Sequence, residues 1–219
     1  MKQSIRTLLM LVAISISCSV ARAATPLRNG DLIFQESCRG TMNDAIKGVT
    51  TSISGYQFTH VGIVWIHQKD TFVIEATRPR VAITPLKEFL HPEAEKACPP
   101  VSVLARMKPR FQSLIPQAIE EARRLVGKDY DSAFIFNNDM YYCSELVYEI
   151  FLKANQNVPV FTLNSMTFKA PGSKDFTPEW VEYYKKLGEP IPEGEPGINP
   201  GAMSKADVIE VLGELGHIE

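Results

Sequence analysis

The sequence predicts an α+β fold in a single domain. Strand patterns cluster in the middle of the chain, with helical patterns before and after them, which is typical of α+β proteins. No internal repeat or low-complexity linker divides the 219 residues, and 45% of them are apolar, which is enough to form a core. We therefore expect one domain over residues 24–219, preceded by an N-terminal signal.

Five runs have the β-branched and aromatic composition of strands. They cover residues 29–35, 59–67, 71–77, 80–84 and 101–107. The second and third, "THVGIVWIH" and "TFVIEAT", are joined by the polar "QKD", which predicts a β-hairpin.

Helical patterns occupy the second half of the chain. Apolar residues recur at helical spacing over 113–126, and Gly127 ends that run. Another helix begins near Cys143 and fades by Asn155. The remaining third is irregular, with an amphipathic helix over Pro178–Leu187, a Pro/Gly-rich loop and a last short helix.

The N-terminus has the pattern of an export signal. Lys2 and Arg6 precede an apolar run from Leu8, and Ala21 and Ala23 form a small-x-small cleavage pattern. We expect residues 1–23 to be a signal peptide, which places the mature protein in the periplasm or cell envelope.

Two alternatives to cleavage stay open. The apolar run is shorter than the roughly 20 residues that span a bilayer, which disfavours a membrane anchor. Cys18 would allow a lipoprotein, but the preceding "SIS" lacks the usual large aliphatic residue. No other apolar stretch is long enough to span a membrane, so we expect no transmembrane span in the mature chain.

The charge disfavours a nucleic-acid partner. The formal net charge is −2 and the pI is about 6.1. Proteins that bind nucleic acid need a basic surface to neutralise phosphates.

The mature chain has three cysteines in what we expect to be an oxidising compartment. An odd count leaves at least one thiol free or paired with another molecule. Cys38 and Cys98 both lie in polar, turn-rich surroundings, and a bond between them would leave Cys143 alone. The sequence leaves this pairing open.

Cys143 opens its helix and shares a face with apolar residues, whereas Ser144, Glu145, Tyr148 and Glu149 are expected to point elsewhere. This pattern fits a buried core cysteine, because free cysteine is often buried. The helix N-terminus, however, stabilises a thiolate and can receive an oxyanion. The second interpretation requires a base nearby.

His60 and Glu75 provide that base and a group to orient it. If the hairpin turns between Gln68 and Lys69, residues whose numbers sum to 137 lie opposite each other. His60 and Glu75 are then diagonal neighbours on one face, whereas a slip of one residue would separate them. Gly62 beside them is expected to leave room for the cysteine helix. The three residues follow the logic of a catalytic triad.

The segments "GDLIFQ", "FTHVGIV", "FVIEAT", "GKDYDSAF" and "YYCSELVYEIF" resemble, in this order, the YiiX/YaeF branch of the NlpC-type papain-like cysteine peptidases and amidases. The resemblance runs from about Gly30 to Ala154. It implies a circularly permuted papain-like fold, since His60 and Glu75 precede Cys143, with an antiparallel sheet packed against the cysteine helix.

The resemblance implies that Cys143 is the nucleophile, His60 the base and Glu75 the residue that holds the imidazole. It also places Tyr130 near the cysteine and Thr59 where the family often has serine; we assign both to substrate binding, with a core aromatic as the alternative for Tyr130. No metal or other cofactor is expected, and "HExxH", paired "CxxC" and "GxSxG" motifs are absent from the sequence.

The leading function is a secreted cysteine hydrolase that cleaves an amide bond through a thioester. Its substrate would be a cell-wall peptide or another amino-acid-containing amide. One alternative is a thiol-dependent lipid esterase or acyltransferase related to lecithin retinol acyltransferase, with a lipid substrate. A second alternative is an exported binding protein without turnover, since a fold does not fix a function.

Overall fold

A computed structural model describes residues 25–38 and 40–215, except for the side chain of residue 94. The predicted signal peptide and Cys18 lie outside this range. Within it, no helix combines the length and the apolar character needed to cross a bilayer.

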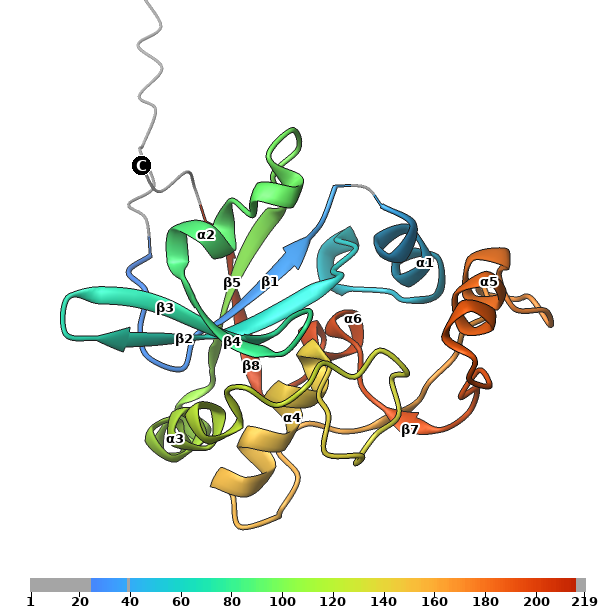
Figure 1. The fold of residues 1–219 in the computed structure, drawn as a ribbon. Coiled ribbons are helices and arrows are strands. Elements are labelled where there is room, and N and C mark those ends of the chain that lie inside the picture. The colour runs from blue at the N-terminus through green and yellow to red at the C-terminus, as the bar shows by residue number, and fades with distance from the viewer. Residues whose placement is uncertain (1–24, 39, 216–219) are drawn as a thin grey trace, which may run out of the picture.

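An antiparallel sheet of six strands in the order β4-β3-β2-β1-β5-β8 forms the centre of the molecule (Figure 1). The strands are β1 (Leu32–Glu36), β2 (His60–His67), β3 (Asp70–Ala76), β4 (Val81–Pro85), β5 (Val101–Met107) and β8 (Ile209–Glu214). A separate pair joins β6 (Asn164–Ser165) to β7 (Pro196–Gly197). The mixture of helices with an antiparallel sheet confirms the predicted α+β class.

Helices cover both faces of this sheet. The described helices are α1 (Thr41–Val49), α2 (Leu86–Leu90), α3 (Ile115–Leu125), α4 (Cys143–Ala154), α5 (Pro178–Leu187) and α6 (Pro200–Ser204). Helices α3 and α4 share the main core with Val61, Ile63 and Ile74, whereas α2 packs on the opposite face with Val64 and Val73. Helices α1 and α5 form a third, aromatic-rich cluster at one side of the molecule (Figure 1).

The hairpin has the predicted register. Ile63 pairs with Ile74, and His67 pairs with Asp70, so the paired residue numbers sum to 137. The turn therefore contains an even number of residues and keeps the alternate residues of β2 and β3 on common faces. This register places His60 and Glu75 on the same face of the sheet.

The prediction that Gly62 leaves room for the cysteine helix was wrong. A Cβ atom at this position would meet the side chains of Val73 and Phe89. Phe89 belongs to α2, which covers the face opposite α4. Gly62 therefore lets α2 approach the sheet, and the cysteine helix approaches from the other side.

Helix α4 is buried more completely than its sequence pattern indicates. Ser144, Glu145 and Tyr148 were expected to point away from the core, yet each is at most 6% exposed. The α3 helix, the sheet and the segment before α4 together enclose the first turns of the helix. The start of α4 is thus fixed inside the protein.

The C-terminal element differs from the predicted last helix. A short helix, α6, is present, but residues 209–214 form β8, which pairs with β5 along the edge of the sheet. Helix α1 was also missed. The strand character of β8 depends on pairing with β5, over a separation of about 100 residues that local patterns do not report.

Cys38 and Cys98 form a disulfide with a Cα–Cα distance of 5.8 Å, and Cys143 is the free cysteine of the described residues. The bond joins the segment after β1 to the segment before β5. Its two cysteines are 60 residues apart in the chain, and a loop of this length is worth about 4 kcal/mol in the chain-entropy model.

We expect the double substitution Cys38→Ser/Cys98→Ser to lower the free energy of unfolding by about 2–4 kcal/mol. Urea unfolding of the variant and of the oxidised wild type measures this difference. Equal midpoints in the two proteins would show that the bond does not stabilise the fold.

Candidate active site

His60 and Glu75 form a hydrogen-bonded pair at the end of the β2–β3 hairpin. The Nε2 atom of His60 lies 2.5 Å from Oε2 of Glu75, and their side chains are 21% and 9% exposed. The pair is therefore largely shielded from water but not sealed from it.

Thr84 completes the support of this pair. Its hydroxyl donates a hydrogen bond of 2.6 Å to Oε1 of Glu75 from the adjacent strand β4. Burial alone raises the pKa of Glu75, but the bonds from His60 and Thr84 outweigh it and hold the pKa below its usual value. Glu75 is thus an ionised acceptor. Sequence analysis missed Thr84. Ala82 pairs with Glu75 across the strands, and Thr84 lies two residues further along β4, so its side chain is on the same face of the sheet as that of Glu75.

Cys143, the first residue of α4, is a neighbour of His60, the first residue of β2. Burial lowers the pKa of the imidazole, but the interaction with Cys143 and the hydrogen bond that the ring donates to Glu75, together with the charges of both groups, raise it to about 10. Because Nε2 faces Glu75, Nδ1 is the ring nitrogen left for the thiol. The raised pKa favours the imidazolium, which is the form that pairs with a thiolate.

Cys143 is the first residue of α4, with the peptide N–H groups of the first turn around it. The first backbone bond of the helix runs from Leu146 N–H to the carbonyl of Tyr142. The N–H group of Cys143 therefore has no partner within the helix. Such a group can donate to an oxyanion that forms beside the sulfur.

Tyr130 lies beside the cysteine, as predicted. Burial and then the charge of Cys143 raise the pKa of its hydroxyl, so the group stays protonated and able to donate. The backbone N–H of Tyr130 donates to the carbonyl of Pro79. The guanidinium of Arg78 lies 4.8 Å from the ring centroid, which restrains the ring further.

Thr59 also lies at the site, but its hydroxyl is engaged by the backbone. It accepts a bond from Ser37 N–H and donates to the carbonyl of Gln35. Its assignment to substrate binding stays a prediction.

Two cavities meet at this site. The narrow one has a volume of about 50 Å³, includes Cys143, and is mostly lined by apolar and aromatic side chains that include Val49, Tyr142, Met166, Phe168, Trp180 and Ile198. The wider one has a volume of about 650 Å³ and contains His60 and Glu75. Thr59 and Tyr130 line both cavities. We name the first the apolar arm and the second the polar arm.

Comparison with known proteins shows what this chain is similar to. Residues 26–213 match the model of the permuted papain-like amidase family YaeF/YiiX, peptidase family C92. The chain belongs to this family. It therefore has the permuted papain-like fold and is a cysteine amidase or peptidase. The predicted kinship with NlpC-type enzymes is an inference from this fold.

Two relatives from Escherichia coli support this assignment to the C92 family. The chain is 29% identical over 205 residues to the uncharacterised protein YiiX of strain K12, covering 90% of this chain and 91% of YiiX. A crystal structure of metalloprotein YiiX from strain O157:H7 matches with a TM-score of 0.69 at 25% identity. That match covers 85% of this chain and 97% of the YiiX chain.

No group of three or more His, Cys, Asp or Glu side chains is placed to hold a metal ion in the described ranges. The expectation that this C92 member works without a metal stays a prediction.

Two buried carboxyl groups organise the segment between Tyr130 and Cys143, which sequence analysis did not foresee. Asp131 accepts bonds from the N–H groups of Ala133 and Ile135, and Glu145 accepts one from Asn137. The second carboxyl oxygen of Glu145 is buried without a hydrogen-bond partner. Burial, followed by the charge of Asp131, raises the pKa of Glu145 to about 8.

This raised pKa predicts a pH-dependent stability. The folded protein holds a proton on Glu145 that the unfolded chain releases, so the free energy of unfolding falls as pH rises from about 4.5 to about 8. We expect Glu145→Gln to show a smaller loss of stability over this range than the wild type. Urea unfolding at the two limits measures it, with the exposed Glu189→Gln as control. Equal losses in Glu145→Gln and the wild type would contradict the prediction.

Proposed function

We propose that this protein is an exported cysteine hydrolase that cleaves an amide bond with Cys143 as nucleophile, His60 as acid and base, and Glu75 as the residue that orients His60. The observation that carries the proposal is the position of His60, whose Nε2 bonds Oε2 of Glu75 at 2.5 Å and whose pKa the neighbouring Cys143 helps to raise. Membership of a family of cysteine amidases supports the same reaction class.

The reaction proceeds in two steps on these groups. The sulfur of Cys143 attacks the carbonyl carbon, the C–N bond breaks, and the leaving nitrogen takes the proton of the His60 imidazolium. A thioester remains on Cys143. Water then attacks the thioester and gives a proton to His60, which releases the acid and restores the thiolate with the imidazolium. The N–H of Cys143 and the hydroxyl of Tyr130 are donors for the oxyanion of both steps.

The apolar arm favours a substrate with an apolar acyl group. The arm contains Cys143 and is lined largely by aromatic and aliphatic side chains, and its volume of about 50 Å³ admits a small apolar group attached to the carbonyl carbon. The apolar lining also keeps a second candidate, a thiol esterase or acyltransferase that acts on lipid esters, although a long acyl chain would need more room than the 50 Å³ of the arm. Release of an amine identifies the first activity, and release of an alcohol identifies the second.

Export is part of the proposal. It rests on the sequence of residues 1–23 and is supported by the disulfide between Cys38 and Cys98, since such bonds persist in oxidising compartments. The N-terminal mass of the protein recovered from its producing cell tests this. A start near Ala24 supports cleavage, and a lipid on Cys18 supports the lipoprotein alternative.

Brief alkylation with iodoacetamide followed by peptide mapping tests the nucleophile. We expect rapid labelling of Cys143 in the wild type and slow labelling in His60→Ala, because the imidazolium stabilises the thiolate. A screen of acyl amides and acyl esters then separates the two candidate functions. Slow labelling in both proteins, with no turnover of either substrate class, would favour the non-catalytic binding protein.

A further inference from the structure

The chain between Tyr130 and Cys143 forms a loop whose two ends lie side by side. Tyr130 pairs with Tyr141 in an isolated parallel bridge, and the N–H of Asp131 donates to the carbonyl of Tyr141. We name this segment the 131–142 loop. The proposed oxyanion donor and the proposed nucleophile are the two residues that flank it, so a shift of the loop would move one relative to the other.

The 131–142 loop has a strained backbone. Phe134, Asn137 and Asp139 have positive φ angles of 55°, 67° and 63°. Asn and Asp tolerate this left-handed region, whereas a bulky side chain such as Phe enters it only at a steric cost. Such conformations persist only where the surrounding structure holds them. The loop therefore depends on specific contacts for its shape.

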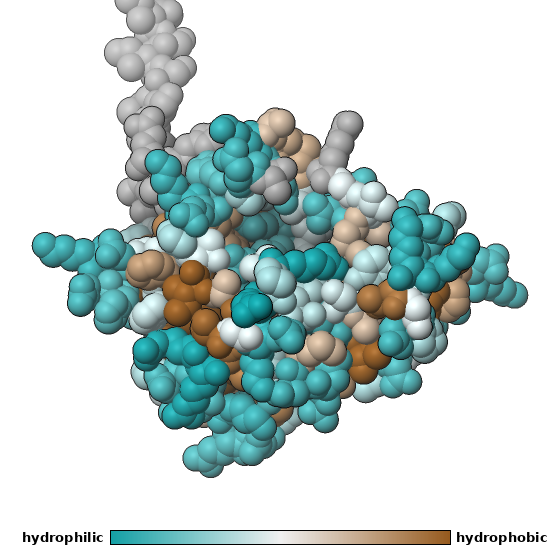
Figure 2. Space-filling view, viewed as in Figure 1, coloured by the Kyte–Doolittle hydropathy of each residue, from teal (hydrophilic) through white to brown (hydrophobic). Residues whose placement is uncertain are grey.

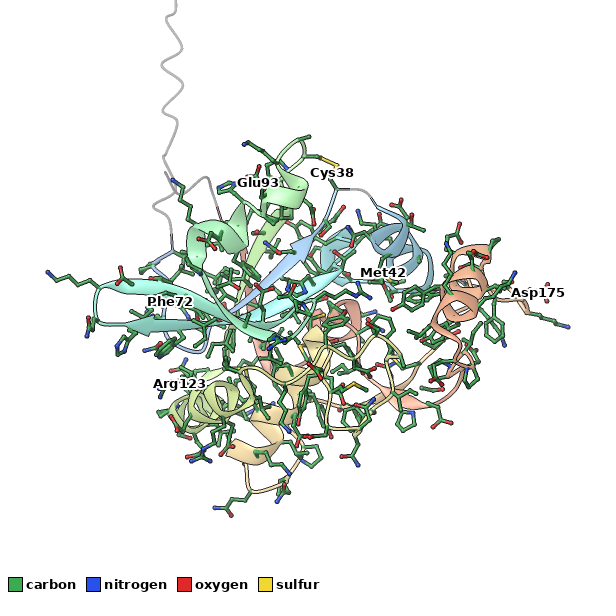
Figure 3. The ribbon with its side chains drawn as sticks, in the orientation of Figure 1. Cys38, Met42, Phe72, Glu93, Arg123 and Asp175 are labelled. Atoms are coloured by element: carbon green, nitrogen blue, oxygen red, sulfur yellow. A yellow bond between two sulfur atoms is a disulfide. The ribbon has the colours of Figure 1, made fainter. Side chains whose placement is uncertain are left out.

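Helix α5 holds the outer side of the loop. The hydroxyls of Tyr183 and Tyr184 donate to the carbonyls of Ser132 and Ala133 at 2.7 and 2.9 Å. Figure 3 shows side chains packed densely around the start of α4 and the segment before it. These contacts fix the first residues of the loop but do not reach its middle.

Two buried carboxyl groups hold the loop from the inside. Asp131 accepts the N–H groups of Ala133 and Ile135 at 2.8 and 2.6 Å, and Glu145 accepts the N–H of Asn137 at 3.0 Å. Asp131 is 0% exposed and Glu145 is 2% exposed, beneath a mostly hydrophilic lower surface (Figure 2). Because Glu145 belongs to α4, its bond joins the middle of the loop to the helix that carries the nucleophile.

Glu145 is placed where a negative charge is costly. Burial raises its pKa to about 8, the bond from Asn137 opposes this rise, and the charges of Asp131 and Glu149 add to it. Glu149 itself pairs with Lys153. The second carboxyl oxygen of Glu145 is buried without a hydrogen-bond partner. Glu145 therefore carries a proton at neutral pH.

The tyrosines beside Glu145 do not titrate in the same range. Burial, together with carboxylates that include Glu145, raises the pKa of Tyr141 to about 12 and holds the pKa of Tyr142 well above its usual value. Their hydroxyls stay neutral below pH 10. Ionisation of Glu145 is thus the change expected around this loop between about pH 7 and pH 9.

We propose that Glu145 is a positioning residue of the hydrolysis: it holds the 131–142 loop so that the Tyr130 hydroxyl stays beside the sulfur of Cys143, and its ionisation loosens the loop and slows the reaction. The inference rests on the proposed function, in which Tyr130 donates to the oxyanion. A protonated Glu145 keeps the bond from Asn137 without placing a second buried charge near Asp131. An ionised Glu145 favours an open loop, in which water reaches the carboxylate.

The pH profile of turnover tests the proposal. The raised pKa means that the contribution of Glu145 to the closed loop is complete below about pH 4.5 and is lost as the pH rises through about 8. His60, with a pKa of about 10, titrates later. We expect kcat of the wild type to fall about tenfold between pH 7 and pH 9, and kcat of Glu145→Gln to stay level, because an amide cannot ionise.

The exposed Glu189→Gln is the matched control for this profile and should follow the wild type. A fall of kcat in Glu145→Gln equal to that of the wild type would overturn the proposal.

A second variant separates positioning from general support of the fold. Glu145→Leu removes the acceptor of the Asn137 N–H and should lower kcat about 10- to 10²-fold at pH 7, whereas Glu145→Gln should keep most of it. Tyr130→Phe should cost a similar factor. The double variant Tyr130→Phe/Glu145→Leu should be little slower than Tyr130→Phe, because Glu145 acts through Tyr130. Full multiplication of the two losses would contradict this dependence.

Alkylation of Cys143 by iodoacetamide provides the comparison for Glu145→Leu. Alkylation forms no oxyanion, so the variant should be labelled within about threefold of the wild type at pH 7 while its turnover is reduced. If labelling and turnover fell together, Glu145 would support the fold rather than Tyr130, and the proposal would be wrong.

Hydrogen exchange of the N–H groups of Ala133, Ile135 and Asn137 gives a readout without substrate. We expect their protection factors to fall between pH 7 and pH 9 in the wild type and to stay constant in Glu145→Gln. Constant protection in the wild type would overturn the proposal. The expected exchange pattern in a protein that neither labels at Cys143 nor turns over substrate would contradict the proposed hydrolysis and leave the dependence of the loop on Glu145 supported.

Discussion

Cys143→Ala is expected to abolish turnover, with a loss of about 10⁴-fold or more on any confirmed substrate, because no other described thiol is free to form the thioester. The side chain is 6% exposed and packs at the start of α4, so the change removes one buried sulfur atom without adding a charge or a bulky group. The fold should therefore persist.

Initial rates of wild type and variant test this prediction, and circular dichroism with urea unfolding verifies that the variant is folded. Cys38→Ser/Cys98→Ser is the matched control, since it removes two cysteines away from His60 and should keep most of the activity at a temperature where it is folded. A folded Cys143→Ala protein with wild-type rates would exclude Cys143 as the nucleophile.

The second large effect concerns how the two other members of the triad act. His60→Ala should also cost about 10⁴-fold, because both covalent steps pass a proton through the imidazole. Glu75→Gln should cost only about 10- to 10³-fold, because the amide can still bond the imidazole at the 2.5 Å position but no longer stabilises its charged form. The two losses should not multiply.

A double-mutant cycle measures this dependence. We expect Glu75→Gln combined with His60→Ala to be little slower than His60→Ala alone, since the carboxylate acts through the histidine. Thr84→Val removes one hydrogen bond to Glu75 and keeps the charge of its carboxylate, so we expect a smaller loss of rate than in Glu75→Gln. Full multiplication of the two effects, or a silent Glu75→Gln, would show that Glu75 does not act through His60.

The part of the site that sequence analysis predicted depends on strand alternation. An even turn between β2 and β3 was enough to place His60 beside Glu75, and the structure has that register. Placing Thr84 also required the register between β3 and β4, which the sequence analysis did not assign. Its hydroxyl was therefore missed although its strand was predicted.

The misplaced features all depend on contacts between distant segments. Helical periodicity assumes one exposed face, but α4 is enclosed on nearly all sides, which buried Glu145 against expectation. The neighbour of Gly62 was also misplaced, because Phe89 belongs to helix α2 and no local sequence pattern shows that this helix packs against Gly62. Strand β8 likewise exists through its pairing with β5.

The central claim is that the sulfur of Cys143 carries the acyl group between the two steps. Mass spectrometry of the protein shortly after mixing with a para-nitrophenyl ester of a short-chain fatty acid tests it most directly, because an activated ester forms the thioester faster than water removes it. We predict one acyl group on the peptide that contains Cys143, no adduct in Cys143→Ala, and a slow adduct in His60→Ala. An acyl group on another residue, or an unmodified Cys143 while the ester is consumed, would contradict the account.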